Sequence, residues 1–453
     1  MVNLSDIRKV YLVGIGGISM SSLARYFCQR GCEVAGYDKT STVLTRELEA
    51  EGIPVIYEDN PEQIPTQYRE TDPSVLVIYT PAVPKDAAVY RFFVDQGFEL
   101  YKRSQVLGIL SNGMFTIAVA GTHGKTTTSS LIAHLLLNGG NKCSAFLGGI
   151  SGNYDTNLIV GENNVMVCEA DEYDRSFLTL HPDIAVITSM DADHLDIYGD
   201  KSHLTDSFEL FASQVTPTGK IFLKKGLDVK RGVSTYSAEE IADAYASNIR
   251  IENGEFVFDF INQELEIPNL VVGLQGQHNI ENAVAAIQVA LVMEISVEKI
   301  REGLRNFKGV KRRFEYVVKE DEHVYIDDYA HHPEELRACF KAVRTLYPDK
   351  KFTAVFQPHL YTRTRDFADG FAEVLGMVDE LILMEIYPAR ELPIEGIDSR
   401  FLLDKIVLEN KRLLTKEEVL KFVENTKPEL LVTVGAGNID TLVKPIKETY
   451  TNA

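Results

Sequence analysis

The stretch Phe115–Thr128 reads FTIAVAGTHGKTTT and decides the fold of the middle of the chain. Its apolar start is typical of a buried strand, and a helical pattern begins after the glycines. In such a strand-turn-helix, backbone N–H groups surround phosphate oxygens, Lys125 neutralises the β and γ oxygens, and the Thr126 hydroxyl completes a Mg²⁺ shell. Val119 stands where the usual GxxxxGK[ST] pattern has its first glycine. A chance Gly-Lys-Thr loop is the alternative, which the flanking strand and helix disfavour. The residues predicted to bind ATP here are Gly121, Thr122, His123, Gly124, Lys125, Thr126 and Thr127.

Acidic residues follow the next apolar run, Val165–Cys168. Glu169 is the best candidate for a Mg²⁺ ligand, because nucleotide-bound Mg²⁺ takes one or two carboxylates near the phosphates. We interpret Glu172 and Asp174 as part of a solvated acidic loop. His194 follows a further apolar strand, and it is either a structural histidine or part of a second metal site.

A second glycine-rich turn, Gly14–Ser19, lies between the apolar run Val10–Val13 and a helical pattern. Small residues at such a turn let backbone N–H groups and a helix N-terminus approach a phosphate. Asp38 ends the following strand, where folds of this kind hold a ribose hydroxyl. Ser19 replaces the third glycine of the dinucleotide pattern, which disfavours a standard NAD site. A purely structural glycine turn is the alternative.

The same succession of strand, turn and helix recurs along the 453 residues. Because a domain takes about 150 residues, the length indicates roughly three domains. We predict an α/β protein with a Rossmann-like parallel sheet at residues 1–110, a central P-loop ATPase-type domain at 111–308 and a C-terminal Rossmann-like domain at 309–453. Short alternating segments at residues 229–270 predict a small antiparallel β insertion in the central domain.

The charge balance restricts the partners of the chain. Lys and Arg number 46 against 66 Asp and Glu, which gives a net charge of −20. So acidic a protein is a poor general binder of nucleic acid or anionic membranes, and any phosphate must be bound locally. No stretch reaches the ~20 apolar residues of a membrane span. We expect no membrane insertion and a cytoplasmic location.

The five cysteines are scattered and lack metal-ligand CxxC spacing. Reduced thiols fit this pattern. Cys28 and Cys32 are one helical turn apart and could form a redox pair, but we interpret them as buried small apolar residues.

A long helix is predicted at Asn279–Val292. Asn279 and Asn282 are three positions apart, so they share a face at the helix start, where amides either cap the helix or read an adenine edge. Capping is the main alternative for Asn279.

Three polar clusters mark the last domain: Arg312–Glu315, Asp327–Pro333 and Gln357–Arg365. Two of them follow buried strands, and together they offer arginines and histidines beside few carboxylates. This composition suits anionic substrates and phosphoryl transfer. A surface salt-bridge network is the alternative for each cluster.

These segments together resemble the Mur ligases. GTHGKTTT, EADEYDRSFL, DADHLDIYG, GQHNIENAVAA, DDYAHHPEE, FQPHLYTRTRDF and GAGNI occur in the order of that family and span essentially the whole chain. The N-terminal GIGGIS and the paired His331-His332 are similar to the members that add L-alanine to UDP-N-acetylmuramate.

The resemblance implies an ATP-dependent amide ligase of peptidoglycan precursor synthesis that uses Mg²⁺, or Mn²⁺ in its place. The γ-phosphate passes to the muramoyl carboxylate, and the amine of L-alanine attacks the acyl phosphate. The implied partners are small molecules, and the protein is expected to be a monomer or homodimer. Two other functions stay open: a recycling ligase that adds a murein tripeptide, and a non-catalytic module that binds UDP-sugar and ATP.

The resemblance also implies roles for individual residues. The residues that match catalytic positions are Lys125, Glu169, His194, Arg313 and His331. Those that match the metal ligands are Thr126, Glu169 and His194. Beyond the phosphate loop, ATP is expected at His278, Asn279, Asn282, Arg313 and Asp328. The UDP-sugar is expected at Gly16, Gly17, Asp38 and Arg103, and the amino acid at Tyr329, His331, His359 and Arg363.

Two positions depart from the family pattern. Leu360 follows His359 where an arginine is frequent, and Arg390 stands where glycine is common. We expect the contacts around both positions to differ from the usual ones.

Overall fold

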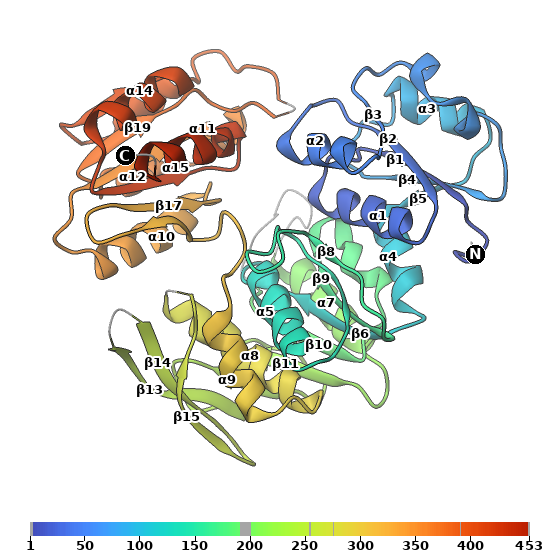
Figure 1. The fold of residues 1–453 in the computed structure, drawn as a ribbon, viewed down its shortest axis with the longest axis horizontal. Coiled ribbons are helices and arrows are strands. Elements are labelled where there is room, and N and C mark those ends of the chain that lie inside the picture. Colours follow the sequence, from blue (N-terminus) through green and yellow to red (C-terminus); the bar gives the residue numbers. More distant parts are fainter. Residues whose placement is uncertain (1–2, 191–200, 253–254, 275, 390, 452–453) are drawn as a thin grey trace. The chain divides into compact units, whose positions relative to one another are not determined.

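The computed structural model describes residues 3–190, 201–252, 255–274, 276–389 and 391–451. The chain forms two compact units, Met1–Gly309 and Val310–Ala453. The first unit contains two sheets and the second contains one (Figure 1).

The N-terminal sheet has five parallel strands in the order β3-β2-β1-β4-β5. Along β1 (Lys9–Val13), Val10 and Leu12 belong to one buried cluster while Tyr11 and Val13 belong to another, so both faces of the sheet are covered. The strand order reverses at β1, so the glycine turn after this strand lies at the switch point, where such sheets bind ligands. The other elements are α1 (Ile18–Gln29), β2 (Glu33–Tyr37), α2 (Val43–Ala50), β3 (Val55–Ile56), η1 (Pro61–Gln63), η2 (Thr66–Tyr68), β4 (Val75–Tyr79), α3 (Ala88–Asp95), β5 (Leu100–Lys102) and α4 (Arg103–Ser111).

The central sheet has ten strands in the order β15-β14-β13-β12-β11-β10-β6-β9-β7-β8. Strand β6 (Phe115–Ala120) is parallel to both neighbours, β9 (Val165–Ala170) and β10 (Ile184–Ile187). Polar loops therefore leave three adjacent strands at one edge of the sheet. The other elements of this sheet region are α5 (Lys125–Asn138), β7 (Ser144–Phe146), β8 (Leu158–Ile159), η3 (Tyr173–Thr179), α7 (Lys201–Ser213), β11 (Lys220–Lys224), β12 (Ser234–Ser237), β13 (Ala244–Glu252), β14 (Glu255–Asn262), β15 (Glu266–Val271), α8 (Gln277–Val292) and α9 (Val297–Asn306).

The segment predicted as a small β insertion does form antiparallel strands, β13 to β15. It is not a separate sheet, because β12 pairs in parallel with β11 and joins these strands to the central sheet. Phe258 and Phe260 on β14 are fully buried in the same core cluster as residues of α8.

The second unit contains a six-stranded sheet in the order β16-β17-β21-β18-β19-β20, parallel except for β16. On β18, Phe352, Ala354 and Phe356 face one core cluster and Val355 the opposite one. The elements are β16 (Glu315–Lys319), β17 (Val324–Asp328), α10 (Pro333–Leu346), β18 (Phe352–Phe356), α11 (Tyr361–Asp366), α12 (Ala368–Leu375), β19 (Glu380–Leu383), α13 (Ser399–Lys405), β20 (Lys411–Leu413), α14 (Lys416–Thr426), β21 (Leu430–Val434), η4 (Asn438–Leu442) and α15 (Val443–Thr451).

All five cysteines are free thiols, but the prediction that Cys28 and Cys32 are buried is wrong. Cys28 is exposed in the last turn of α1, and Cys32 is half-buried beyond Gly31, where the helix has ended. The other three cysteines are buried. Among the described helices, none has the length and apolar character to span a membrane.

Candidate active site

The N-terminal glycine turn is closed by Asp38. The backbone N–H of Gly16 donates to Oδ2 of Asp38 at 2.9 Å, and the N–H of Thr40 donates to Oδ1 at 3.1 Å. A Cβ at Gly16 would lie 2.8 Å from that carboxylate, so the turn requires glycine at this position. Burial raises the pKa of Asp38, against the effect of the two N–H donors. Asp38 therefore holds the turn in shape, and its predicted contact with a ribose remains a prediction.

The phosphate loop follows β6 directly and leads into α5 at Lys125. Gly121 and Gly124 have φ values of +137° and +80°, which only glycine adopts without strain. The loop is held from the next strand end, where Ser189 accepts the His123 N–H at 2.6 Å. The backbone thus has the turn into a helix N-terminus that the sequence predicts.

Lys125 is buried in an ion pair. Its Nζ lies 2.8 Å from Oε2 of Glu172 and donates to the carbonyl of Gly121 at 2.5 Å. Burial lowers the pKa of Lys125, but the carboxylates of Glu172 and Glu169 outweigh it and raise the pKa, so the ammonium stays charged. Glu172 is only 1% exposed, so our interpretation of this residue as part of a solvated loop is wrong.

Thr126 and Glu169 form the candidate metal site. The Thr126 hydroxyl donates to Oε2 of Glu169 at 2.8 Å, and Gly148 packs so closely on this carboxylate that a Cβ there would clash. A hydroxyl and a carboxylate oxygen side by side are the hard ligands that Mg²⁺ prefers, so the donor set fits the ion. His194, the third predicted ligand, lies outside the described residues.

Arg103, the first residue of α4, lies near the candidate metal site. Its Nη2 lies 3.3 Å from Oδ2 of Asp171, two positions beyond Glu169. A small cavity joins Arg103 and Glu169 to the first turns of α1. The structure thus brings the N-terminal helices and the candidate metal site to one cavity within the first unit.

A buried amide connects α1 to the central sheet. Asn157, which is 0% exposed, accepts a hydrogen bond from Arg25 Nη1 at 2.5 Å. Its Nδ2 donates to the carbonyl of Ile18 at 2.5 Å and to Oγ of Ser21 at 2.9 Å. The helix that follows the glycine turn is therefore fixed to the loop between β7 and β8. Sequence reasoning missed Asn157, because it belongs to no motif.

The start of α8 lies against the phosphate loop. Nδ2 of Asn282 donates to Oδ1 of Asn279 at 3.2 Å, and a Cβ at Gly124 would lie 3.0 Å from Oδ1 of Asn282. The capping alternative for Asn279 is wrong, because α8 begins at Gln277 and Gly276 is its N-cap. His278, in the first turn of the helix, is exposed.

In the second unit, a short segment before β16 is docked on the end of β17. Nε of Arg312 lies 3.1 Å from Oδ2 of the fully buried Asp327, and the Phe314 N–H donates to Oδ2 of Asp328 at 2.6 Å. Arg312 and Phe314 both have positive φ, on either side of Arg313. Burial raises the pKa of Asp327 to about 7, although Arg312 opposes the shift.

Aromatic and cationic side chains gather beside this segment. The Tyr329 ring lies 5.5 Å from the Arg313 guanidinium and 5.2 Å from the His331 ring. His331 in turn contacts the ring of His359 at 5.9 Å, and Nδ1 of His359 lies 3.4 Å from Nη1 of Arg363. Burial and the neighbouring Arg363 lower the pKa of His331, against the carboxylate of Glu335. The structure thus brings together five of the residues predicted from the three polar clusters, which could bind an anionic group.

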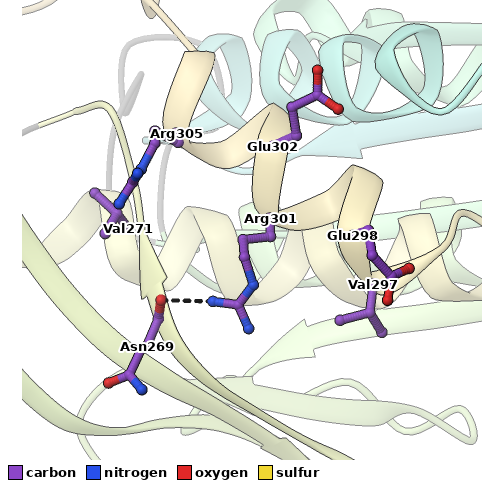
Figure 2. Close-up of a pocket in the computed structure, with 7 residues that line it drawn as sticks. All are labelled: Asn269, Val271, Val297, Glu298, Arg301, Glu302 and Arg305. Atoms are coloured by element: carbon purple, nitrogen blue, oxygen red, sulfur yellow. Dashed lines mark hydrogen bonds between the residues drawn. The ribbon is translucent and has the colours of Figure 1, made fainter.

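A separate groove of about 420 Å³ lies between α9 and β15 (Figure 2). Arg301 donates to the carbonyl of Asn269 at 2.7 Å there, and Figure 2 shows both side chains. The lining includes two arginines and two glutamates, so the opposite charges balance, and we assign the groove no role.

Family models match three parts of the chain. The Mur ligase family catalytic domain matches residues 9–114, the Mur ligase middle domain matches 119–290, and the Mur ligase glutamate ligase domain matches 312–437.

Relatives match over nearly the full length. A UDP-N-acetylmuramate--L-alanine ligase of Christiangramia forsetii is 50% identical over 99% of both chains, and one of Parabacteroides distasonis is 49% identical over 99% of this chain and 98% of its own. The crystal structure of a UDP-N-acetylmuramate-alanine ligase from Thermotoga maritima superposes with a TM-score of 0.83 at 26% identity and covers 98% of this chain and 99% of that one. A murein peptide ligase from Psychrobacter arcticus, 21% identical with a TM-score of 0.71 over 97% of this chain and 99% of its own, shares the fold.

Proposed function

The chain belongs to the Mur ligase family, and on this premise we propose that it is an ATP-dependent ligase that joins L-alanine to the lactyl carboxylate of UDP-N-acetylmuramate. The products are UDP-N-acetylmuramoyl-L-alanine, ADP and phosphate, and the reaction serves peptidoglycan synthesis. The observation that carries the proposal is the 50% identity, over 99% of both chains, with a ligase of that name.

The residues of the first unit support an acyl-phosphate route. A carboxylate is a poor electrophile, and transfer of the γ-phosphate of ATP turns one of its oxygens into a leaving group. The amine of L-alanine then attacks the carbonyl carbon, and the tetrahedral intermediate releases phosphate. The phosphate loop binds the triphosphate, and Lys125 neutralises the charge that develops on the transferred group. Glu172, which pairs with Lys125 in this structure, is the acceptor that the phosphate oxygens replace.

Thr126 and Glu169 are the residues that would hold Mg²⁺, with His194 as a further ligand. When bound there, Mg²⁺ would supply positive charge that offsets the negative charge of the phosphates. Arg103 and Ser19, the last residue of the glycine turn, line the same cavity, which supports binding of the UDP-sugar along α1.

We assign the remaining substrate groups to the residues that the resemblance implies. Asn279 and Asn282 of the first unit lie beside the phosphate loop and receive the adenine side of ATP. Arg313 and Asp328 are the ATP contacts that the second unit lends, and the cluster around His331 receives L-alanine. The three domains divide the ligands accordingly, with residues 1–110 for the UDP-sugar, 111–308 for ATP and 309–453 for the amino acid.

Phosphate release from ATP and Mg²⁺ tests the proposal. UDP-N-acetylmuramate is present in every reaction, and L-alanine, glycine, L-serine or a murein tripeptide is added in parallel. We expect release that requires both the UDP-sugar and L-alanine, with weaker release for glycine and L-serine, because one methyl group or hydroxyl changes binding by only ~1–3 kcal/mol.

Release with the tripeptide alone would contradict the proposal and indicate a recycling ligase. Absence of release with every amino acid would indicate a non-catalytic binding module. Omission of Mg²⁺, with Mn²⁺ added back in its place, tests the metal requirement in the same assay.

A further inference from the structure

The short helix α11 carries Arg363 and begins without a cap of its own. Its N-cap residue is Leu360, which has φ +71° and gives no side-chain cap. The first N–H groups of a helix lack partners within the helix. Here the N–H of Thr362 donates to Oε2 of Glu391 at 3.0 Å, and the Thr362 hydroxyl donates to Oε1 of the same carboxylate. Glu391, 29 positions away in sequence, therefore replaces the missing cap.

Tyr387 also holds the chain just before the helix. The ring of Tyr387 stacks on His359 with centroids 5.8 Å apart and an interplanar angle of 17°. The Leu360 N–H donates to the carbonyl of Tyr387 at 3.0 Å, and the Tyr387 N–H donates to the carbonyl of Pro358 at 2.8 Å. Tyr387 and Glu391 thus fix the chain on both sides of the turn from His359 into α11.

Arg363 is the cationic group that this arrangement presents. Its guanidinium lies 3.4 Å from Nδ1 of His359, and in the described part of the chain it forms no ion pair with a carboxylate. A half-buried arginine without a carboxylate partner can bind a carboxylate through two parallel hydrogen bonds, provided that its backbone is held in one position.

We propose that Glu391 is a positioning residue for the amino-acid substrate: through Thr362 it holds α11 so that Arg363 faces the substrate carboxylate. This inference rests on the proposed function, which supplies an amino acid with a free carboxylate. Glu391 does not touch the substrate, and it acts through the helix that it caps.

The direction in which the KM for L-alanine changes distinguishes this positioning role from a direct effect of the negative charge of Glu391. Glu391 is negative and lies near the cations of α11, including Arg365. If its charge were what mattered, Glu391→Gln would remove a repulsive group and lower the KM for L-alanine. If its hydrogen bonds to Thr362 position Arg363, the same substitution raises that KM.

Steady-state kinetics of the full-length enzyme test the proposal. We expect Glu391→Gln to raise the KM for L-alanine about tenfold, with kcat and the KM values for ATP and UDP-N-acetylmuramate within about twofold. Thr362→Val removes one of the two hydrogen bonds to Glu391, so we expect the KM for L-alanine to rise about threefold. The KM of the double variant should be no higher than that of Glu391→Gln alone, because both substitutions break the same contact. Glu395→Gln, an exposed carboxylate of the same loop, is the matched control and leaves every constant unchanged.

L-alaninamide supplies a readout that a merely structural role would not move. The preference of the wild-type enzyme for L-alanine over L-alaninamide measures recognition of the carboxylate, and Glu391→Gln should reduce this preference by the same factor of about ten. A KM for L-alanine that is unchanged or lower in both variants, or an equal rise in all three KM values, would overturn the inference. Absence of L-alanine-dependent turnover in the wild-type enzyme would instead overturn the proposed function and the inference with it.

Discussion

Removal of the Asn157 side chain tests how the helix after the glycine turn is held. Asn157→Ala deletes three hydrogen bonds at a site with no exposure, one of them to the charged Arg25. A hydrogen bond to a charged group contributes ~1.5–3 kcal/mol and a neutral one ~0.5–1.5 kcal/mol. Arg25 keeps its ion pair with Glu51 at 2.6 Å, so its charge is not left alone. We expect a loss of about 4 kcal/mol in the free energy of unfolding of the first unit.

Differential scanning calorimetry measures this loss as a change in Tm. An unfolding entropy of about 2.1 cal/mol/K per residue gives about 0.65 kcal/mol/K for the unit Met1–Gly309, so the transition should shift down by roughly 6 °C. The matched control is Asn163→Ala, which removes an exposed hydrogen bond of 2.6 Å to Asn141 and should shift Tm by less than about 1 °C.

Kinetics give the second readout for Asn157→Ala. Because Ile18 and Ser21 lie in the first turns of α1, we expect the KM for UDP-N-acetylmuramate to rise about fivefold while the KM for L-alanine stays constant. Equal Tm values for the two asparagine variants would refute the reasoning, because they would show that the buried amide contributes no more than the exposed one.

Three further outcomes follow from the described contacts. Lys125→Ala should lower kcat/KM by about a thousandfold or more, because it removes the ammonium that neutralises the transferred phosphate. The exposed Lys142→Ala should leave turnover unchanged. Phosphate release measures both variants, and wild-type turnover in Lys125→Ala would remove Lys125 from the mechanism. Glu169→Gln should raise the Mg²⁺ concentration for half-maximal rate about tenfold. Glu162→Gln, at an exposed carboxylate, is the control. An unchanged dependence of the rate on Mg²⁺ in Glu169→Gln would contradict the assignment of Glu169 as a metal ligand. Burial raises the pKa of Asp327 to about 7, so between pH 4 and pH 7 the folded state keeps a proton that the unfolded state has lost, and this group makes the second unit less stable as the pH rises. The Tm of wild type minus that of Asp327→Asn should therefore fall between about pH 4 and pH 7 and then level off, and a constant difference would contradict the shift.

Apolar runs in the sequence predict strands at Glu33–Tyr37, Val75–Tyr79, Phe352–Phe356 and Leu430–Val434, and β2, β4, β18 and β21 have these bounds. A strand buried on both faces of a parallel sheet shows as a largely apolar segment. Other strand ends differ from the prediction: β9 continues beyond the apolar run Val165–Cys168 to Ala170, because Glu169 still pairs with β6. The two-residue strand β8 carries no such signal, since its pairing with β7 is set by the sheet beside it.

Helix starts that depend on unusual backbone were harder to predict. The sequence predicts that α8 begins at Asn279. The helix begins two positions earlier, at Gln277, because Gly276 adopts φ +101° and is its N-cap. At α11 the cap comes from Glu391, which no local pattern contains.

The placement of the phosphate loop and of Glu169 at strand ends could be predicted, because each belongs to a short motif that follows an apolar run. Glu172 could not be assigned correctly from the sequence, since its burial depends on Lys125, 47 positions earlier. Whether an acidic side chain after a strand is exposed to water or buried in an ion pair depends on the residue that packs against it in the folded chain. A local sequence pattern does not contain that residue.

The burial of the cysteine thiols allows the stability of the two units to be measured separately. Burial raises the pKa of Cys143 and Cys168, in the first unit, to about 12, and it also raises the pKa of Cys339 in the second unit. A maleimide can therefore label Cys28 in the native protein, while each of these three reacts only when the unit around it opens. After Cys28 has been blocked, the alkylation rate at Cys168 reports the opening free energy of the first unit, and the rate at Cys339 reports that of the second, in a single sample read by peptide mass spectrometry.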